Sequence, residues 1–304
     1  MMMYEMLYLG DTPITVYALL LALLALLTIG AGAALAKKQG ISPRQMCLFG
    51  VLAAVLGLLL GRGIYCAVCW FDVFLDAMGE FQGIAPFFDL TFGGVNVMGV
   101  VAGLLLAAPL TTALTKTRAA ELLDAAVVPA LTMYILARVI EPLSGQGYGD
   151  FMGRDVCVCW LEAGLTALLL AAVPFLRRRA RRPGTLAQTA LTLWCLIQIL
   201  PESLRCDEAL YVLVFARVTH LGLALTLGIV LIRLLVQGAR RGLSAKAILV
   251  DAIAFAAGIG LCIATIFALD KTNLPKLLVY AGMLFSIAEL GFIICRRISQ
   301  EDRR

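Results

Sequence analysis

Long apolar runs recur along the whole chain, and they limit its fold more than any other feature. The runs lie at about residues 13–36, 46–69, 94–115, 122–141, 160–176, 186–203, 211–235, 246–269 and 275–295. A helix needs about 20 predominantly apolar residues to cross the hydrocarbon core of a bilayer. The alternating pattern of a transmembrane barrel is absent. We therefore predict an all-α polytopic membrane protein with about nine transmembrane helices.

The composition excludes a soluble domain. The chain is 62% hydrophobic and 15% charged, with a mean hydropathy of +0.94. The net charge of +5 comes from basic loops, so it does not indicate nucleic-acid binding. Glu5 and Asp11 precede the first apolar run, so we expect no cleavable signal peptide. Apart from a CxxC at residues 66–69, the cysteines are scattered, and we expect neither a metal nor another cofactor.

The charges of the connecting loops predict the orientation of the spans. Alternate loops hold most of the Lys and Arg residues, including the run at residues 177–182, which we interpret as an orientation signal or an anionic-lipid site. Because cytoplasmic loops carry the excess of Lys and Arg, we predict an external N-terminus and a cytoplasmic C-terminus. Cys157, Cys159 and Cys206 then lie outside, where disulfides are permitted, but the sequence does not decide whether they pair.

The loop at about residues 70–92 combines aromatic and acidic residues. Amphipathic aromatic side chains settle at the membrane interface, so this loop is expected either to lie there or to pack on the rim of the bundle.

The stretch from Arg138 to Gly149 ends one apolar run with ionisable residues. Arg138 and Glu141 are three residues apart, which places them on one face of a helix. Ionisable groups at a membrane boundary are costly unless paired or bound to a ligand, and are therefore functional candidates. Pro142 and three glycines follow, so we expect the helix to stop there.

Further polar residues occupy the predicted outer ends of other spans: Arg62, Glu162, Glu202, Arg205, Arg217 and His220. Arginines at such a boundary suit a phospholipid phosphate, which they hold by charge-assisted hydrogen bonds. A neighbouring carboxylate suits a general base. The alternative interpretation is that Arg138–Glu141 and Glu202–Arg205 are helix-end pairs that satisfy each other.

Several short motifs follow one another over about residues 13–235. They are Tyr17 at the head of the first span, Gly-Arg-Gly-Ile-Tyr at 61–65, Gly-Gly-Val-Asn-Val-Met-Gly at 93–99, the stretch 138–149, Trp-Leu-Glu at 160–162, Arg-Pro-Gly at 182–184 and Pro-Glu-Ser-Leu-Arg at 201–205. In order and spacing they resemble the prolipoprotein diacylglyceryl transferase family, a group of bacterial membrane enzymes.

The resemblance implies a fold, a location and an activity. It implies a seven-helix membrane core at residues 1–240, followed by two additional helices and a short cytoplasmic tail at 241–304, in the bacterial cytoplasmic membrane. In the family, phosphatidylglycerol donates its diacylglyceryl group to the thiol of a lipobox cysteine, and glycerol phosphate leaves. The implied partners are thus a phospholipid and an exported prolipoprotein peptide.

The resemblance also assigns roles to residues. Arg138 is expected to hold the phosphate, with Glu141 or Glu202 as the catalytic base. The expected substrate-binding residues are Tyr17, Arg62, Tyr65, Asn96, Gln146, Gly149, Gln198 and Arg205.

The chain departs from the family pattern at several polar positions. Met98 stands at the family's histidine, Glu141 and Ser144 at asparagines, Gln146 at a glutamate and Gln198 at an arginine. Two alternatives therefore stay open beside the transferase. One is a paralogue that binds or moves phospholipid without this transfer. The other is a transferase with a different lipid or acceptor.

Overall fold

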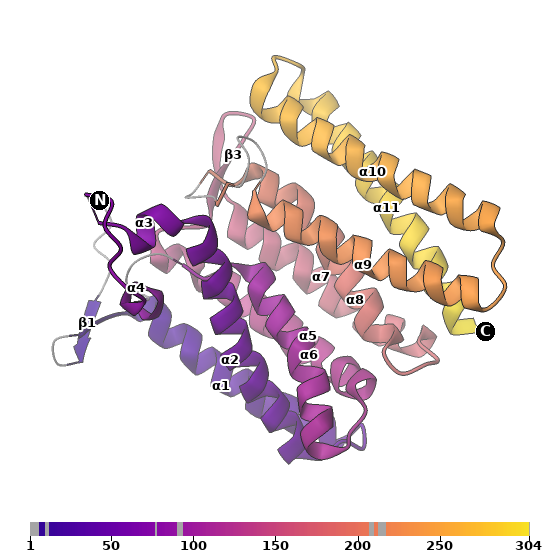
Figure 1. Ribbon diagram of the computed structural model, residues 1–304, viewed down its shortest axis with the longest axis horizontal. Helices are drawn as coiled ribbons and strands as arrows, with labels where there is room; N and C mark the ends of the chain where they lie inside the picture. Colours follow the sequence, from indigo (N-terminus) through magenta and orange to yellow (C-terminus); the bar gives the residue numbers. More distant parts are fainter. Residues whose placement is uncertain are drawn as a thin grey trace. The chain divides into compact units, whose positions relative to one another are not determined.

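The computed structural model describes residues 6–9, 12–76, 78–89, 94–206, 210–211 and 217–303 (Figure 1). The chain forms two compact units, residues 1–146 and 147–304. Gly93, which opens the predicted glycine motif, lies outside the described residues. These two units do not correspond to the family core that the sequence predicts at residues 1–240. That core stays a prediction.

The architecture is that of an all-α polytopic membrane protein, as predicted. Within the described part of the chain, eight helices are long and apolar enough to cross a membrane. The sixth predicted span, α8 (Thr185–Leu204), is also a helix of 20 residues, but it falls outside that group. It carries Gln188, Gln198 and Glu202, which lower its hydropathy.

The first unit holds four long helices. They are α1 (Val16–Lys37), α2 (Pro43–Val68), α5 (Val97–Thr115) and α6 (Ala119–Ile140). Helix α1 packs against α2 and α6, and α2 packs against α5. A short antiparallel hairpin of β1 (Met6–Leu9) and β2 (Thr12–Thr15) precedes α1.

Helices α2 and α5 approach so closely that their contact requires glycine. Gly57 and Gly61 on α2 face Gly99 and Gly103 on α5, each pair at four-residue spacing. A Cβ atom on Gly99 would lie 2.4 Å from the Gly61 Cα, and one on Gly103 would lie 2.3 Å from the Gly57 nitrogen. Small residues at this spacing let two membrane helices pack backbone to backbone.

The end of α6 agrees with the prediction from Pro142. The helix ends at Ile140, and a 3-10 turn, η1 (Glu141–Ser144), continues the chain. Gly145 then takes a positive φ of 74°, a conformation that glycine adopts without steric cost.

The aromatic loop contains two short helices, α3 (Trp70–Phe74) and α4 (Ala85–Phe88). Val73 and Phe74 are buried against Cys66 at the end of α2, while Phe71 and Phe88 are exposed. Part of the loop thus packs on the rim of its unit, and part presents aromatic rings to the surroundings.

The second unit begins with a hairpin of β3 (Tyr148–Phe151) and β4 (Arg154–Cys157). Its helices are α7 (Val158–Arg179), α8, α9 (Val218–Arg240), α10 (Ala245–Lys271) and α11 (Lys276–Arg303). Helix α8 packs against α7, α9 and α11, and α10 lies along α11 (Figure 1). Helix α11 continues past the predicted end at residue 295.

Buried carboxylates on the last two helices connect them to other parts of the second unit. On α11, the Asp302 carboxylate accepts hydrogen bonds from the backbone nitrogens of Arg181 and Arg182 (3.0 and 2.9 Å) and from the Thr185 hydroxyl (3.0 Å). On α10, buried Asp251 accepts a charged hydrogen bond from Arg297. Helix α11 therefore connects α10 to the start of α8.

The α2–α5 contact predicts a sharp effect of one methyl group. Gly99→Ala should destabilise the protein by about 1–3 kcal/mol, because the new Cβ meets backbone that cannot move aside. Gly30→Ala on α1 is the control, since nothing lies within 4 Å of its Cβ position. Thermal unfolding in detergent measures both. Equal midpoints for the two variants would contradict the tight contact.

Candidate functional site

Arg62 fastens the aromatic loop to α2. Its Nε donates to the Phe87 carbonyl (3.0 Å), Nη1 to Gly94 (3.3 Å) and Nη2 to Pro86 and Asp89 (2.9 and 2.7 Å). The residue is only 1% exposed, and its guanidinium lies 5.1 Å from the centre of the Tyr65 ring. A guanidinium has five N–H donors, so most of them serve backbone carbonyls here. This positioning role was missed in the sequence, and the phosphate role of Arg62 stays a prediction.

Both the backbone and the side chain of Asn96 form hydrogen bonds. Its backbone nitrogen donates to the Gly61 carbonyl (3.0 Å), and its Oδ1 accepts from the Met98 nitrogen (2.9 Å). The second bond is an N-cap, which satisfies one of the unpaired donors at the start of α5. Among the other predicted substrate residues of this unit, Tyr17 and Tyr65 are half-buried and Gln146 is exposed.

Arg138 and Glu141 form the ion pair that their spacing predicts. Arg138 Nη1 lies 2.5 Å from Glu141 Oε2. The guanidinium lies 5.0 Å from the centre of the Tyr134 ring, one helical turn earlier. The Arg138 side chain is 15% exposed and that of Glu141 is 7% exposed, so the pair is partly accessible at the end of its span. It therefore places a cation and a carboxylate together at the end of an apolar helix.

In the second unit, Arg205 pairs with Glu162 rather than with Glu202. Arg205 Nη1 lies 3.2 Å from Glu162 Oε1, and both side chains are buried. The interpretation of Glu202–Arg205 as a self-satisfied pair is therefore wrong. The helix ends at Leu204, so Arg205 leaves its helical face and forms a backbone bridge with Gly149 of β3.

Gly149 is needed because β3 lies directly against the end of α8. A Cβ atom at this position would lie 2.1 Å from the Leu204 carbonyl oxygen and 2.5 Å from Val158. No other residue allows that approach. Gly149 and Arg205, both expected to bind substrate, are joined here by a backbone bridge, and their substrate roles stay predictions.

Arg217 also contacts the C-terminal end of α8. Its Nη1 donates to the Glu202 carbonyl (2.6 Å), and its Nη2 donates to the carbonyl of Arg205. Nη1 also lies 3.9 Å from the Glu202 carboxylate. An arginine at a helix C-terminus satisfies carbonyls that have no partner in the helix. Glu162, Glu202, Arg205 and Arg217 together form a buried cluster with two cations and two anions, called here the Glu162–Arg217 cluster.

Further polar side chains form hydrogen bonds near this cluster. Gln198 Nε2 lies 3.3 Å from the Thr166 hydroxyl, and both residues are buried. His220 Nε2 lies 3.2 Å from the Ser203 hydroxyl and 3.3 Å from the Ile199 carbonyl. The predicted substrate residue Gln198 thus bonds within the helix bundle.

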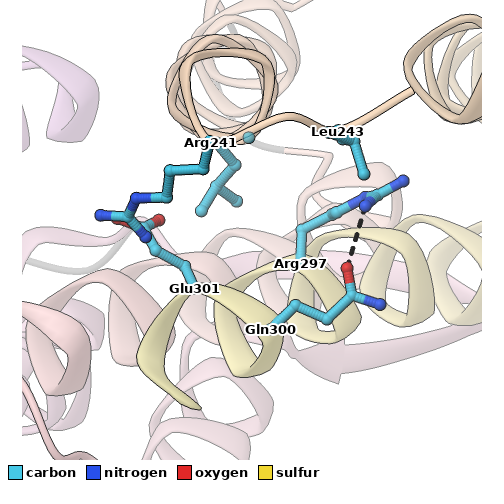
Figure 2. Close-up of a pocket in the computed structure, with 7 residues that line it drawn as sticks. Arg241, Leu243, Arg297, Gln300 and Glu301 are labelled. Carbon is cyan, nitrogen blue, oxygen red and sulfur yellow. Dashed lines mark hydrogen bonds and ion pairs between the residues drawn. The ribbon is translucent and has the colours of Figure 1, made fainter. Parts of the chain in front are cut away.

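Two small cavities lie elsewhere in the second unit. One, of about 30 Å³, is lined by Arg241, Arg297, Gln300 and Glu301 among others (Figure 2). The other, of about 50 Å³, includes Thr185 at the start of α8. Glu202 and Arg205 lie at the opposite end of that helix, and a 20-residue helix is about 30 Å long. The second cavity therefore lies away from Glu202 and Arg205.

Within the described residues, no group of three or more His, Cys, Asp or Glu side chains could hold a metal ion. No family model matches the chain, and no curated protein matches it.

The buried pair Glu162–Arg205 predicts a large loss of stability on neutralisation. Glu162→Gln should destabilise the protein by about 3 kcal/mol, because it removes a carboxylate that pairs with a buried guanidinium. The control is Glu121→Gln, which breaks the exposed pair Arg118–Glu121 and should cost less than about 1 kcal/mol. Unfolding in detergent compares them. Similar losses in both variants would mean that Glu162 contributes no buried charge pair.

Proposed function

We propose that this chain is a phospholipid-dependent transferase that moves a diacylglyceryl group to the cysteine thiol of an exported peptide. The observation that carries the proposal is the Arg138–Glu141 pair. It combines a guanidinium, a carboxylate 2.5 Å away and partial exposure at the end of a span. A planar guanidinium can contact a carboxylate and a phosphate together, and phosphatidylglycerol is the donor that the family resemblance suggests.

The proposed reaction is a nucleophilic displacement at carbon. The peptide thiol gives its proton to a carboxylate, for which Glu141 and Glu202 are the candidates. The sulfur then attacks the glycerol carbon that carries the phosphate. A carbon–sulfur bond forms, the carbon–oxygen bond breaks, and glycerol phosphate leaves with the electron pair. Arg138 stabilises the negative charge on that leaving group.

The remaining predicted residues support this chemistry in two ways. Tyr17, Tyr65 and Gln146 supply accessible polar groups in the first unit. Arg62, Asn96, Gly149, Gln198 and Arg205 have contacts inside their own units, and we assign them to positioning the backbone of those units.

We also propose that the protein lies in the bacterial cytoplasmic membrane with its C-terminus in the cytoplasm. Apart from Arg62 and Arg138, the basic residues of the first unit gather at one end of its helices, where α1 and α5 end and α2 and α6 begin. In the second unit most of them lie near the ends of α7, α9 and α11. Such an excess favours the cytoplasmic side.

The orientation is tested with a reporter fused after the last residue. A cytoplasm-dependent reporter should be active there, and one that requires export should be inactive, because the basic helix ends stay inside. The reverse pattern, in a membrane-inserted fusion, would refute the proposed orientation.

A second candidate function is phospholipid binding without transfer. Two specific observations favour it. Met98, at the position of the family's histidine, is an apolar side chain that is only 6% exposed. Gln198, at the position of a family arginine, is 3% exposed and uncharged. Both replacements remove charge or proton-transfer capacity from positions where the family resemblance expects it.

Complementation in bacteria depleted of their own diacylglyceryl transferase separates the two functions. The wild-type chain should restore growth and the mobility shift of a reporter prolipoprotein. Arg138→Ala should lower the transfer rate by roughly 10²–10³-fold, because the leaving phosphate loses its cation. Arg118→Ala is the matched control, since Arg118 precedes the same helix at its other end and its side chain is 80% exposed.

Membrane insertion of every variant is checked by fractionation. No rescue by inserted wild-type protein would contradict transfer. A phospholipid that co-purifies with the wild type but not with Arg138→Ala would then support the binding function.

A further inference from the structure

Two cysteine sulfurs lie in contact at the start of α7. The Sγ atoms of Cys157 and Cys159 are 3.0 Å apart. A disulfide bond is about 2.05 Å long, so a movement of about 1 Å would join them. Cys157 ends β4 and is half-buried, whereas Cys159 belongs to the first turn of α7 and is fully buried.

The backbone holds both cysteines in place. Cys157 pairs with Tyr148 in the β3–β4 hairpin, and the Cys159 nitrogen donates to the Gly147 carbonyl (3.1 Å). Between them, Val158 is completely buried in a cluster with Leu204 and Tyr280. The two thiols therefore meet without further ordering of the chain, which favours a reaction between them.

The third cysteine of this region cannot take part without backbone movement. Gly149 bridges Val156 of β4 on one edge of β3 and Arg205 on the other. Cys206 follows Arg205, and its nitrogen donates to the Tyr148 carbonyl (3.0 Å). Its backbone is thus two strand spacings, about 10 Å, from that of Cys157. Disulfides rarely span Cα atoms more than about 7 Å apart.

We propose that Cys157 and Cys159 form a reversible disulfide by exchange with a disulfide oxidant. The more accessible thiolate, that of Cys157, attacks the oxidant's disulfide and releases one thiol. Cys159 then attacks Cys157 in the mixed disulfide and releases the second thiol. The pair loses two electrons and two protons, and the oxidant's disulfide becomes two thiols.

The bond would act on the strand–helix junction. It would join the end of β4 to the first turn of α7, one turn before Glu162, which pairs with Arg205. The loop that it closes is very short, and short loops remove little entropy from the unfolded chain. We therefore expect ordinary reductants to open it. The site stands independently of the proposed transfer reaction.

Trypsin separates the relevant thiols for a direct test. Cleavage after Arg154 and Arg177 yields a peptide that contains Cys157 and Cys159 as its two cysteines, while Cys206 lies on the peptide that ends at Arg217. The full-length protein in detergent is equilibrated with reduced and oxidised glutathione, denatured, alkylated with N-ethylmaleimide, digested and analysed by mass spectrometry.

In oxidised glutathione, the peptide with Cys157 and Cys159 should be two hydrogens lighter and carry no alkyl group. In dithiothreitol it should carry two. Cys206→Ser is the matched control and should leave this pattern unchanged, whereas Cys157→Ser should abolish the loss of two hydrogens. Wild-type protein that keeps both thiols alkylated in oxidised glutathione, or that links either one to Cys206, would overturn the proposal.

Discussion

A buried charged side chain must be paired with a hydrogen-bonding group or an opposite charge of the same protein. The rest of this structure depends on that constraint. The hydrocarbon core of a bilayer offers no hydrogen bonds to an ionised side chain, so a charge buried there needs an internal partner. Arg62 uses four backbone carbonyls, Arg205 uses Glu162, and Asp251 uses Arg297. Each arrangement joins segments that lie apart in the sequence, so the charges organise the ends of the helices.

The same constraint separates positioning residues from candidates for chemistry. Arg205 and Arg217 lie in the Glu162–Arg217 cluster, where two cations meet two anions and the side chains are nearly inaccessible. Arg138 also has a carboxylate partner, but its side chain keeps 15% of its surface exposed. Access to lipid and to an incoming peptide is what a transfer site requires. The proposed function therefore centres on Arg138, whose guanidinium has a carboxylate beside it and keeps some exposed surface.

Local patterns in the sequence predicted local contacts well. The three-residue spacing of Arg138 and Glu141 led to the observed ion pair, because a helix brings such residues to one face. The same spacing failed for Glu202 and Arg205. Helix α8 ends between them, so Arg205 turns toward Glu162, which is 43 residues away in the chain. A spacing rule holds only while the helix continues.

The sequence by itself determined the membrane class, the positions of the long helices and the stop before Pro142. Hydrophobic run length and proline geometry act over short distances, so they can be read along the chain. The tertiary structure alone decided that α2 and α5 meet through glycines, that Glu162 neutralises Arg205, and that Cys157 meets Cys159 rather than Cys206. These contacts depend on how separate helices and strands pack. Hydropathy describes the polarity of each residue and does not say which distant residues meet.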